Sequence, residues 1–253
     1  MIELKDLCVE FGKGQDIVKA VNKVSFSIPK NSTLGLVGES GSGKTTVGRA
    51  IIRLVKPKSG QILFAGKDLQ GLSDSQFLPY RKKMQMIFQD PYSSLDPRMS
   101  IRGSLKEALE LGHPDEKKIW EDIAAEKMKI VGLDPEYLSR YPHEFSGGQR
   151  QRIGIARALC VEPEFLICDE PVSSLDVSIQ AQILNLLMDL QSQLGLSYLF
   201  ISHDLRVVKH ISQKVAVMQK GQIVEMSDTD ALYQNPQHVY TQTLLAAIPG
   251  RIR

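Results

Sequence analysis

The sequence predicts an α/β fold with a mainly parallel sheet, an N-terminal antiparallel β subdomain and an inserted helical subdomain. Short apolar runs alternate along the chain with segments of helical spacing, which is typical of a parallel sheet covered by helices. The N-terminal region alternates apolar and polar side chains instead, as the strands of a small antiparallel sheet do. The 253 residues, 42% hydrophobic and 24% charged, suffice for one globular domain with a real core.

The N-terminal half begins with two expected strands, at residues 2–9 and 18–28, joined by a turn at residues 12–15. A buried strand at residues 33–38 runs into a glycine-rich loop, and residues 44–54 continue with helical spacing. The break at Lys58, Ser59 and Gly60 precedes a further strand at residues 61–64.

The later elements repeat this alternation around a helical insertion. Proline turns and charged helical segments, such as residues 116–131, predict an inserted helical subdomain between about residues 90 and 145. Strands are expected at residues 84–88, 165–168 and 198–201, a helix at 179–194, and a hairpin at 215–218 and 223–226. We expect a single domain over residues 1–253, with the core and β subdomain in 1–88 and 156–253 and the helical subdomain in 89–155.

The bulk properties exclude several classes of protein. A net charge of +2 and a pI near 8.3, with basic and acidic residues interspersed, do not indicate a nucleic-acid partner. No apolar run is long enough to span a bilayer and the N-terminus lacks a signal-peptide layout, so we expect the chain in the cytoplasm. Cys8, Cys160 and Cys168 have no metal-like spacing and are expected as small core hydrophobes.

A phosphate-binding loop is the first chemical motif, and it fits the Walker A pattern between a predicted strand and a predicted helix. Its glycines let backbone N–H groups converge on phosphate oxygens, and the helix N-terminus adds favourable partial charge. The candidate ATP-binding residues are Gly38, Glu39, Ser40, Gly41, Ser42, Gly43, Lys44, Thr45 and Thr46. Lys44 would contact the β- and γ-phosphates, and the Thr45 hydroxyl would ligate Mg²⁺. The loop therefore predicts a P-loop NTPase core that uses ATP and Mg²⁺.

Polar side chains follow two apolar strands. Asp169 and Glu170 should emerge at the carboxyl edge of a parallel strand, where α/β sheets place their ligands. Because adjacent strand residues point in opposite directions, the two acids can take different roles. Asp169 fits the Walker B role of holding the magnesium shell, and Glu170 fits a general base or a water-positioning residue. The amide of Gln89 could ligate the metal or orient water, or it could simply be an exposed loop side chain.

Ser146, Gly147, Gly148 and Gln149 precede a helix expected to begin near Arg150, so they could present a hydroxyl, N–H groups and a helix N-terminus to an anion. A second phosphate site in one chain is explained if it caps ATP bound to another subunit; the alternative is a helix N-cap with a glycine pair. With the phosphate loop and the paired acids, this run resembles the ATP-binding subunits of ABC transporters.

The resemblance implies further roles. Gln89 stands at the Q-loop position, and His203 resembles the switch histidine that contacts the γ-phosphate and arranges Glu170 and water. Asp176, in the run Ser173-Ser174-Leu175-Asp176, resembles the D-loop linking two composite sites. Phe11 stands where the family stacks an aromatic ring on adenine, although a core role for this residue is an alternative.

The family also implies partners. We expect a head-to-tail pair with a second ATP-binding subunit, identical or paralogous, integral-membrane permease subunits, and indirectly an extracytoplasmic substrate-binding protein. The chain would then lie peripherally on the cytoplasmic face of the membrane.

Three segments resemble the branch that serves oligopeptide, dipeptide and nickel importers. They are residues 88–98, 141–145 and 235–241, the last preceding residues 244–249. Val239 replaces the proline usual in the branch. The chain ends at Arg253 without a cysteine-bearing tail, so no iron–sulphur site is expected there. The resemblance favours import of peptides and leaves nickel or another metal chelate as the alternative cargo.

Other classes remain as alternatives. A soluble ABC ATPase for chromosome work would need long coiled coils or a basic groove, and neither is found. A translation-factor type normally carries two ATPase cassettes, and a P-loop kinase has no use for the run at residues 146–149.

Overall fold

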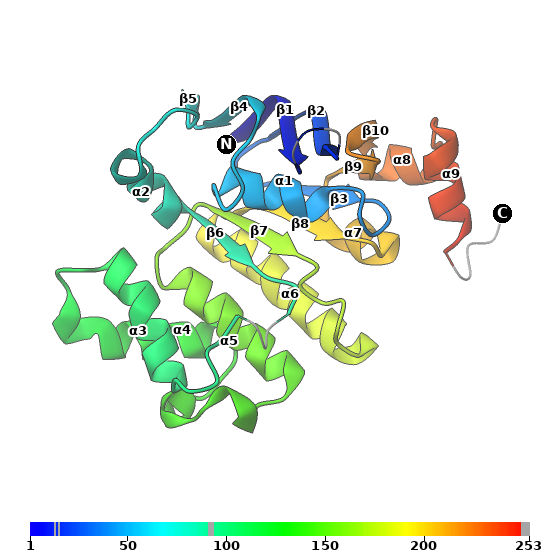
Figure 1. Cartoon of the computed structure of the whole chain (residues 1–253). Coiled ribbons are helices and arrows are strands. Elements are labelled where there is room, and N and C mark those ends of the chain that lie inside the picture. The colour runs from blue at the N-terminus through cyan, green and yellow to red at the C-terminus, as the bar shows by residue number, and fades with distance from the viewer. Residues whose placement is uncertain (13, 15, 91–93, 249–253) are drawn as a thin grey trace. The chain divides into compact units, whose positions relative to one another are not determined.

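The computed structural model describes residues 1–12, 14, 16–90 and 94–248 and divides the chain into two compact units. The first unit contains Met1–Phe77 and Gly195–Arg253, and the second contains Leu78–Leu194 (Figure 1). Part of the expected turn at residues 12–15, residues 91–93 of the branch-like run, Pro249 and Arg253 lie outside the described residues.

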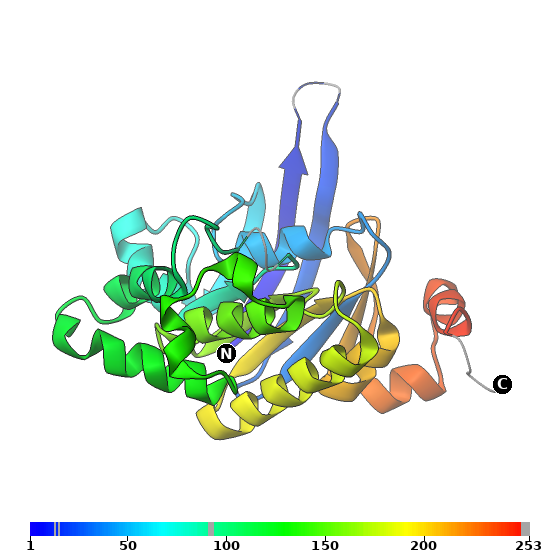
Figure 2. The same ribbon diagram turned by 90° about the horizontal axis from the view of Figure 1, so that it is seen from below.

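The first unit contains an antiparallel sheet in the order β2-β1-β4-β5. Its strands are β1 (Ile2–Phe11), β2 (Val18–Ile28), β4 (Ser59–Phe64) and β5 (Lys67–Asp68). Buried residues alternate with more exposed ones along parts of β1 and β2, because one face of the ribbon packs on the core, and register shifts such as the one between Leu4 and Leu7 interrupt the alternation. Figure 2 shows β1 and β2 as a long two-stranded ribbon.

The other strands of the first unit follow the order β10-β9-β3-β8. These are β3 (Thr33–Val37), β8 (Ser197–Ser202), β9 (Lys214–Gln219) and β10 (Gln222–Asp228). β3 is parallel to both β8 and β9, whereas β9 and β10 form an antiparallel hairpin. Every residue of β3 and β8 is buried, as expected for strands covered on both faces. The helices of this unit are α1 (Lys44–Ile51), α7 (Leu205–Ile211), α8 (Thr229–Gln234) and α9 (Val239–Ala246).

The second unit pairs two parallel strands, β6 (Met84–Ile87) and β7 (Phe165–Asp169), with Ile87 opposite Cys168. Its α-helices are α3 (Ile101–Gly112), α4 (Trp120–Ile130), α5 (Gly147–Leu159) and α6 (Val177–Leu194). Short 3-10 turns lie at Lys117–Ile119, Pro135–Ser139 and Pro142–Glu144. Helix α2 (Asp74–Lys83) runs from the first unit into the second.

The predicted fold class is confirmed: parallel strands alternate with helices, and an antiparallel sheet is built from N-terminal strands. One boundary was predicted wrongly, because α5 begins at Gly147 and not near Arg150. Among the residues described, no helix is both long and apolar enough to cross a bilayer.

Candidate ATP site and signature helix

The phosphate loop lies in the first unit, between β3 and α1, where the sequence predicted it. Its glycines permit backbone conformations and close contacts that other residues would not. Gly43 has φ +104°, and a Cβ built there would lie 2.1 Å from the carbonyl oxygen of Ala20. Gly38 has φ +151°, and its Cβ would lie 2.1 Å from the carbonyl oxygen of Met218. The loop is therefore held tightly against the strands behind it.

Lys44 is the first residue of α1 and is 5% exposed. Its Nζ donates to the carbonyl oxygens of Gly38 and Glu39, both at 2.8 Å, and to Ser42 Oγ at 3.5 Å. The backbone N–H of Gly221, in the β9–β10 turn, donates to the carbonyl of Ser42 at 3.0 Å. The ammonium group is thus held beside the same backbone that would cradle phosphate oxygens.

The remaining candidate ATP-binding residues differ in how exposed they are. Thr45 and Thr46 lie in the first turn of α1 and are partly buried, while Ser40 and Gly41 are exposed. Phe11 is the last residue of β1 and is 45% exposed, so the alternative of a core role is wrong.

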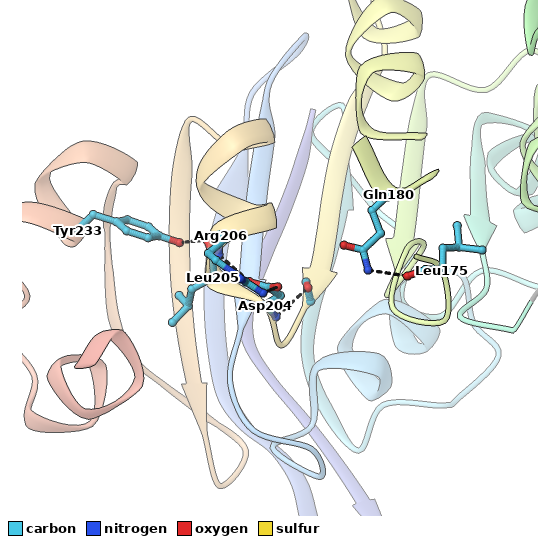
Figure 3. A network of polar contacts seen from close by, with 7 residues as sticks. Leu175, Gln180, Asp204, Leu205, Arg206 and Tyr233 are labelled. Atoms are coloured by element: carbon cyan, nitrogen blue, oxygen red, sulfur yellow. Dashed lines mark hydrogen bonds and ion pairs between the residues drawn. The ribbon is translucent and has the colours of Figure 1, made fainter. Parts of the chain in front are cut away.

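His203 follows β8 in the first unit and its side chain is exposed. Hydrogen bonds fix the backbone that follows His203, at the start of α7. Asp204 caps α7 by accepting the N–H of Arg206 at 2.8 Å, and its carboxylate pairs with the guanidinium of Arg206 at 2.7 Å. The side-chain hydrogen bond from Arg206 lowers the pKa of Asp204. On the other side, the Tyr233 hydroxyl donates to the carbonyl of Leu205 (Figure 3).

In the second unit the structure brings Gln89 and Glu170 together. Gln89 lies two residues beyond β6 and Glu170 follows β7, so both stand at the carboxyl ends of paired parallel strands. Gln89 Nε2 donates to Glu170 Oε2 at 2.9 Å. The amide is therefore engaged with a predicted catalytic carboxylate, although its side chain is exposed.

Asp169 and Glu170 differ in their environments. Asp169 is the last residue of β7 and is 2% exposed, whereas Glu170 is only half-buried. Glu170 has φ +46°, in the left-handed region, so the chain turns sharply as it leaves the strand. Both acids therefore lie at the carboxyl edge of β7 as expected, but only Asp169 belongs to the strand and Glu170 stands in the turn that follows it.

Ser146 is the N-cap of α5. Its Oγ accepts the N–H of Gln149 at 3.3 Å, and the Gln149 side-chain oxygen accepts the N–H of Ser146 at 3.0 Å. This capping box explains why the helix starts at Gly147. Gly148 permits close packing on α6, since a Cβ there would lie 2.5 Å from Ile179 Cγ2. The cap that was an alternative use of this run is present, and its hydroxyl remains exposed.

Asp176 precedes α6 and organises its N-terminus. Its Oδ1 accepts the Ser178 hydroxyl at 2.7 Å and the N–H of Ile179 at 2.9 Å. The hydrogen bond from Ser178 lowers the pKa of Asp176. Gln180 Nε2 also donates to the carbonyl of Leu175 at 2.9 Å (Figure 3). The turn before α6 is therefore bonded to the helix through both the Asp176 carboxylate and the Leu175 carbonyl.

One residue that touches the phosphate loop was missed by sequence reasoning. Tyr240, in α9, accepts the backbone N–H of Glu39 at 3.1 Å. The contact joins residues 201 positions apart, and no local pattern signals it.

Comparison with known proteins places these features in a family. The family model described as ABC transporter matches residues 21–173. The oligopeptide transport ATP-binding protein OppF of Bacillus subtilis is 53% identical over 251 residues, covering 98% of this chain and 82% of that protein. The dipeptide transport ATP-binding protein DppF of Lactococcus lactis is 50% identical over 254 residues, covering 99% and 81%.

Solved structures agree. A dimeric post-hydrolysis state of the ATP-binding cassette MJ0796, bound to ADP and Pi, has a TM-score of 0.79 at 25% identity and covers 90% of this chain and 99% of its own. The cbiO1 protein from Clostridium perfringens has a TM-score of 0.81 at 25% identity, covering 92% and 90%.

The fold and the phosphate loop define an ATP-binding P-loop protein that hydrolyses its nucleotide. The chain belongs to the ABC transporter family.

Proposed function

We propose that this chain is the ATP-hydrolysing subunit of an importer of oligopeptides or dipeptides. The observation that carries the proposal is the similarity of at least 50% identity, over nearly the whole chain, to subunits named for the transport of these compounds. The same cassette would lie on the cytoplasmic face of the membrane, bound to permease subunits, with an extracytoplasmic binding protein delivering the cargo.

The site residues would divide the chemistry of phosphoryl transfer. Lys44 and the N–H groups of the phosphate loop would bind the β- and γ-phosphates, and Phe11 would stack on adenine. Glu170 would take a proton from the water whose oxygen attacks the γ-phosphorus, and ADP would leave. His203 would contact the γ-phosphate and orient that water. The bond from Gln89 to Glu170 supports this assignment, because it fixes the carboxylate that has to receive the proton.

Mg²⁺ fits the donor set that the chain offers. The hydroxyl of Thr45, the amide of Gln89 and the carboxylate of Asp169 all supply oxygen, which this ion prefers. Within the described part of the chain, no group of three His, Cys, Asp or Glu residues could hold a metal by itself. When bound, the ion would neutralise the negative charge that develops on the nucleotide phosphates.

We further propose that the signature residues act on a second subunit. Ser146, Gly147, Gly148 and Gln149, with Asp176, would contact ATP bound by a partner, identical or paralogous. The exposed Ser146 hydroxyl and the N-terminus of α5 support this role, because both favour an anion. The helical segment of residues 89–155 would belong to the same single ATPase domain.

The test is ATPase activity in proteoliposomes that contain the chain with its permease subunits and binding protein. We expect di- and oligopeptides to stimulate hydrolysis, and the E170Q complex to show none. Stimulation by nickel chelates but not by peptides would replace the proposed cargo with a metal. Active hydrolysis that responds to neither would contradict a transport role.

A further inference from the structure

The C-terminal run of residues 235–241 was singled out by sequence, and the proposed ATP chemistry assigns it no role. Its backbone is bound by a side chain of β10. Glu225 Oε1 accepts the N–H of Gln237 at 2.8 Å, and Oε2 accepts the N–H of His238 at 2.9 Å. One carboxylate therefore fixes two consecutive peptide groups of this run.

The same run sets the start of α9. His238 is its N-cap, and His238 Nδ1 accepts the N–H of Tyr240 at 3.1 Å. Gln242 Nε2 donates back to the carbonyl of Pro236 at 3.0 Å. Because both ends of the turn are bonded, Tyr240 is held in one position, and the residue is only 9% exposed.

Tyr240 points its hydroxyl at the phosphate loop. Its oxygen accepts the N–H of Glu39 at 3.1 Å, and the carbonyl of Glu39 accepts Lys44 Nζ at 2.8 Å. The residue that supports the Lys44 ammonium is thus itself bonded to α9. Gly221 anchors the loop further along, at Ser42, so Tyr240 and Gly221 hold different parts of it.

We infer that Tyr240 is a positioning residue for ATP binding: through the N–H of Glu39 it holds the backbone that orients Lys44 toward the phosphates. The inference rests on the proposed role of Lys44. The run at residues 235–241 thereby places a tyrosine of α9 against the phosphate loop.

The test is Y240F in the full chain, which removes the hydroxyl and keeps the ring. We expect the dissociation constant and the KM for ATP to rise about two- to tenfold, the range that one neutral hydrogen bond supplies. The kcat should stay unchanged, because the loop is held equally in the ground state and the transition state. A purely structural role would instead lower the thermal midpoint and leave the KM unchanged, which would overturn the inference.

The matched control is T243V, in the same helix. It removes a hydroxyl that donates to the carbonyl of Val239 at 3.0 Å and does not reach the loop. ATP affinity should equal that of the wild type. E225Q should raise the dissociation constant for ATP, as Y240F does. The loss of binding free energy in the double variant should be smaller than the sum of the losses in the two single variants. Strict additivity would contradict the chain of contacts from β10 to the loop.

K44A separates this inference from the proposed function. If K44A binds ATP normally, the proposed phosphate site fails. If K44A loses ATP while Y240F binds it as tightly as the wild type, only the role of Tyr240 fails.

Discussion

Gln89 Nε2 lies 2.9 Å from Glu170 Oε2, although the two residues are separated by 81 positions in the sequence. The parallel pairing of β6 with β7 brings them together, since each follows the carboxyl end of its strand. An amide that donates to a carboxylate orients it without adding charge. The pair therefore links a residue proposed to ligate Mg²⁺ to the residue proposed to receive the proton.

The first prediction concerns Glu170. E170Q should lower kcat by a factor on the order of 10² to 10⁴, the usual contribution of a general base, while ATP still binds. The variant should accumulate as an ATP-bound dimer, because hydrolysis no longer separates the subunits. Phosphate release and size-exclusion chromatography with ATP measure both effects. Normal phosphate release would rule out Glu170 as the base.

The second prediction concerns Gln89, which donates to Glu170. Q89A should reduce kcat by less than E170Q does, since it removes the group that orients the carboxylate and leaves the carboxylate in place. In the E170Q background, Q89A should have little further effect, because residues that act as a unit are not additive. Single-turnover hydrolysis measures both variants. Additive losses would mean that the two side chains work independently.

The sequence predicted the strands that lead to Asp169 and Gln89 because apolar runs are local patterns, although β6 ends at Ile87, two residues before Gln89. It placed the start of α5 three residues too late, since two glycines were interpreted as a loop. The signal was present: Ser146 with Gln149 three residues later is a capping box. The contact of Tyr240 with Glu39 could not be found, because it depends on tertiary packing over 201 positions.

Ser146 is predicted to have two separable roles. Its oxygen accepts the N–H of Gln149, so S146A should lose about 1 kcal/mol of stability. S146D keeps an N-cap acceptor but places a negative charge against phosphate. We expect S146D to unfold like the wild type in urea and to fail in ATP-dependent dimerisation.

The control for Ser146 is S100D, at the N-cap of α3, where Ser100 Oγ accepts the N–H of Gly103 at 3.3 Å. It makes the same chemical change at a helix outside the proposed site, so dimerisation should persist. Equal dimerisation of S146D and the wild type would remove Ser146 from the interface.

At Gly43, the cost of a positive φ can be distinguished from the cost of a steric collision. G43A should destabilise the fold by well over 1 kcal/mol, since its Cβ would collide with the carbonyl of Ala20 and its φ is +104°. G71A is the matched control: Gly71 has φ +78°, but no atom lies within 4 Å of the added Cβ. Its cost should be about 1 kcal/mol. Urea titrations that give equal losses would refute the close packing of the loop.

The buried thiols give a prediction about pH. Burial raises the pKa of Cys160 to about 12, and burial also raises the pKa of Cys168. An unfolded thiol has a pKa of about 8.5, so the stability linked to these protonated groups is complete below that pH and falls as the pH rises above it. Iodoacetamide at pH 8 should modify only the half-buried Cys8, and all three thiols after unfolding. Rapid native modification of Cys160 would contradict its burial.

The left-handed backbone at Glu170 has an evolutionary consequence. A side chain at φ +46° costs about 1 to 2 kcal/mol that glycine would not incur, so the most stable residue for this position is one that cannot accept a proton. Selection for a thermostable fold and selection for turnover therefore pull this position toward different amino acids. Stabilised variants recovered without an activity screen should accumulate E170G, and those recovered with one should not.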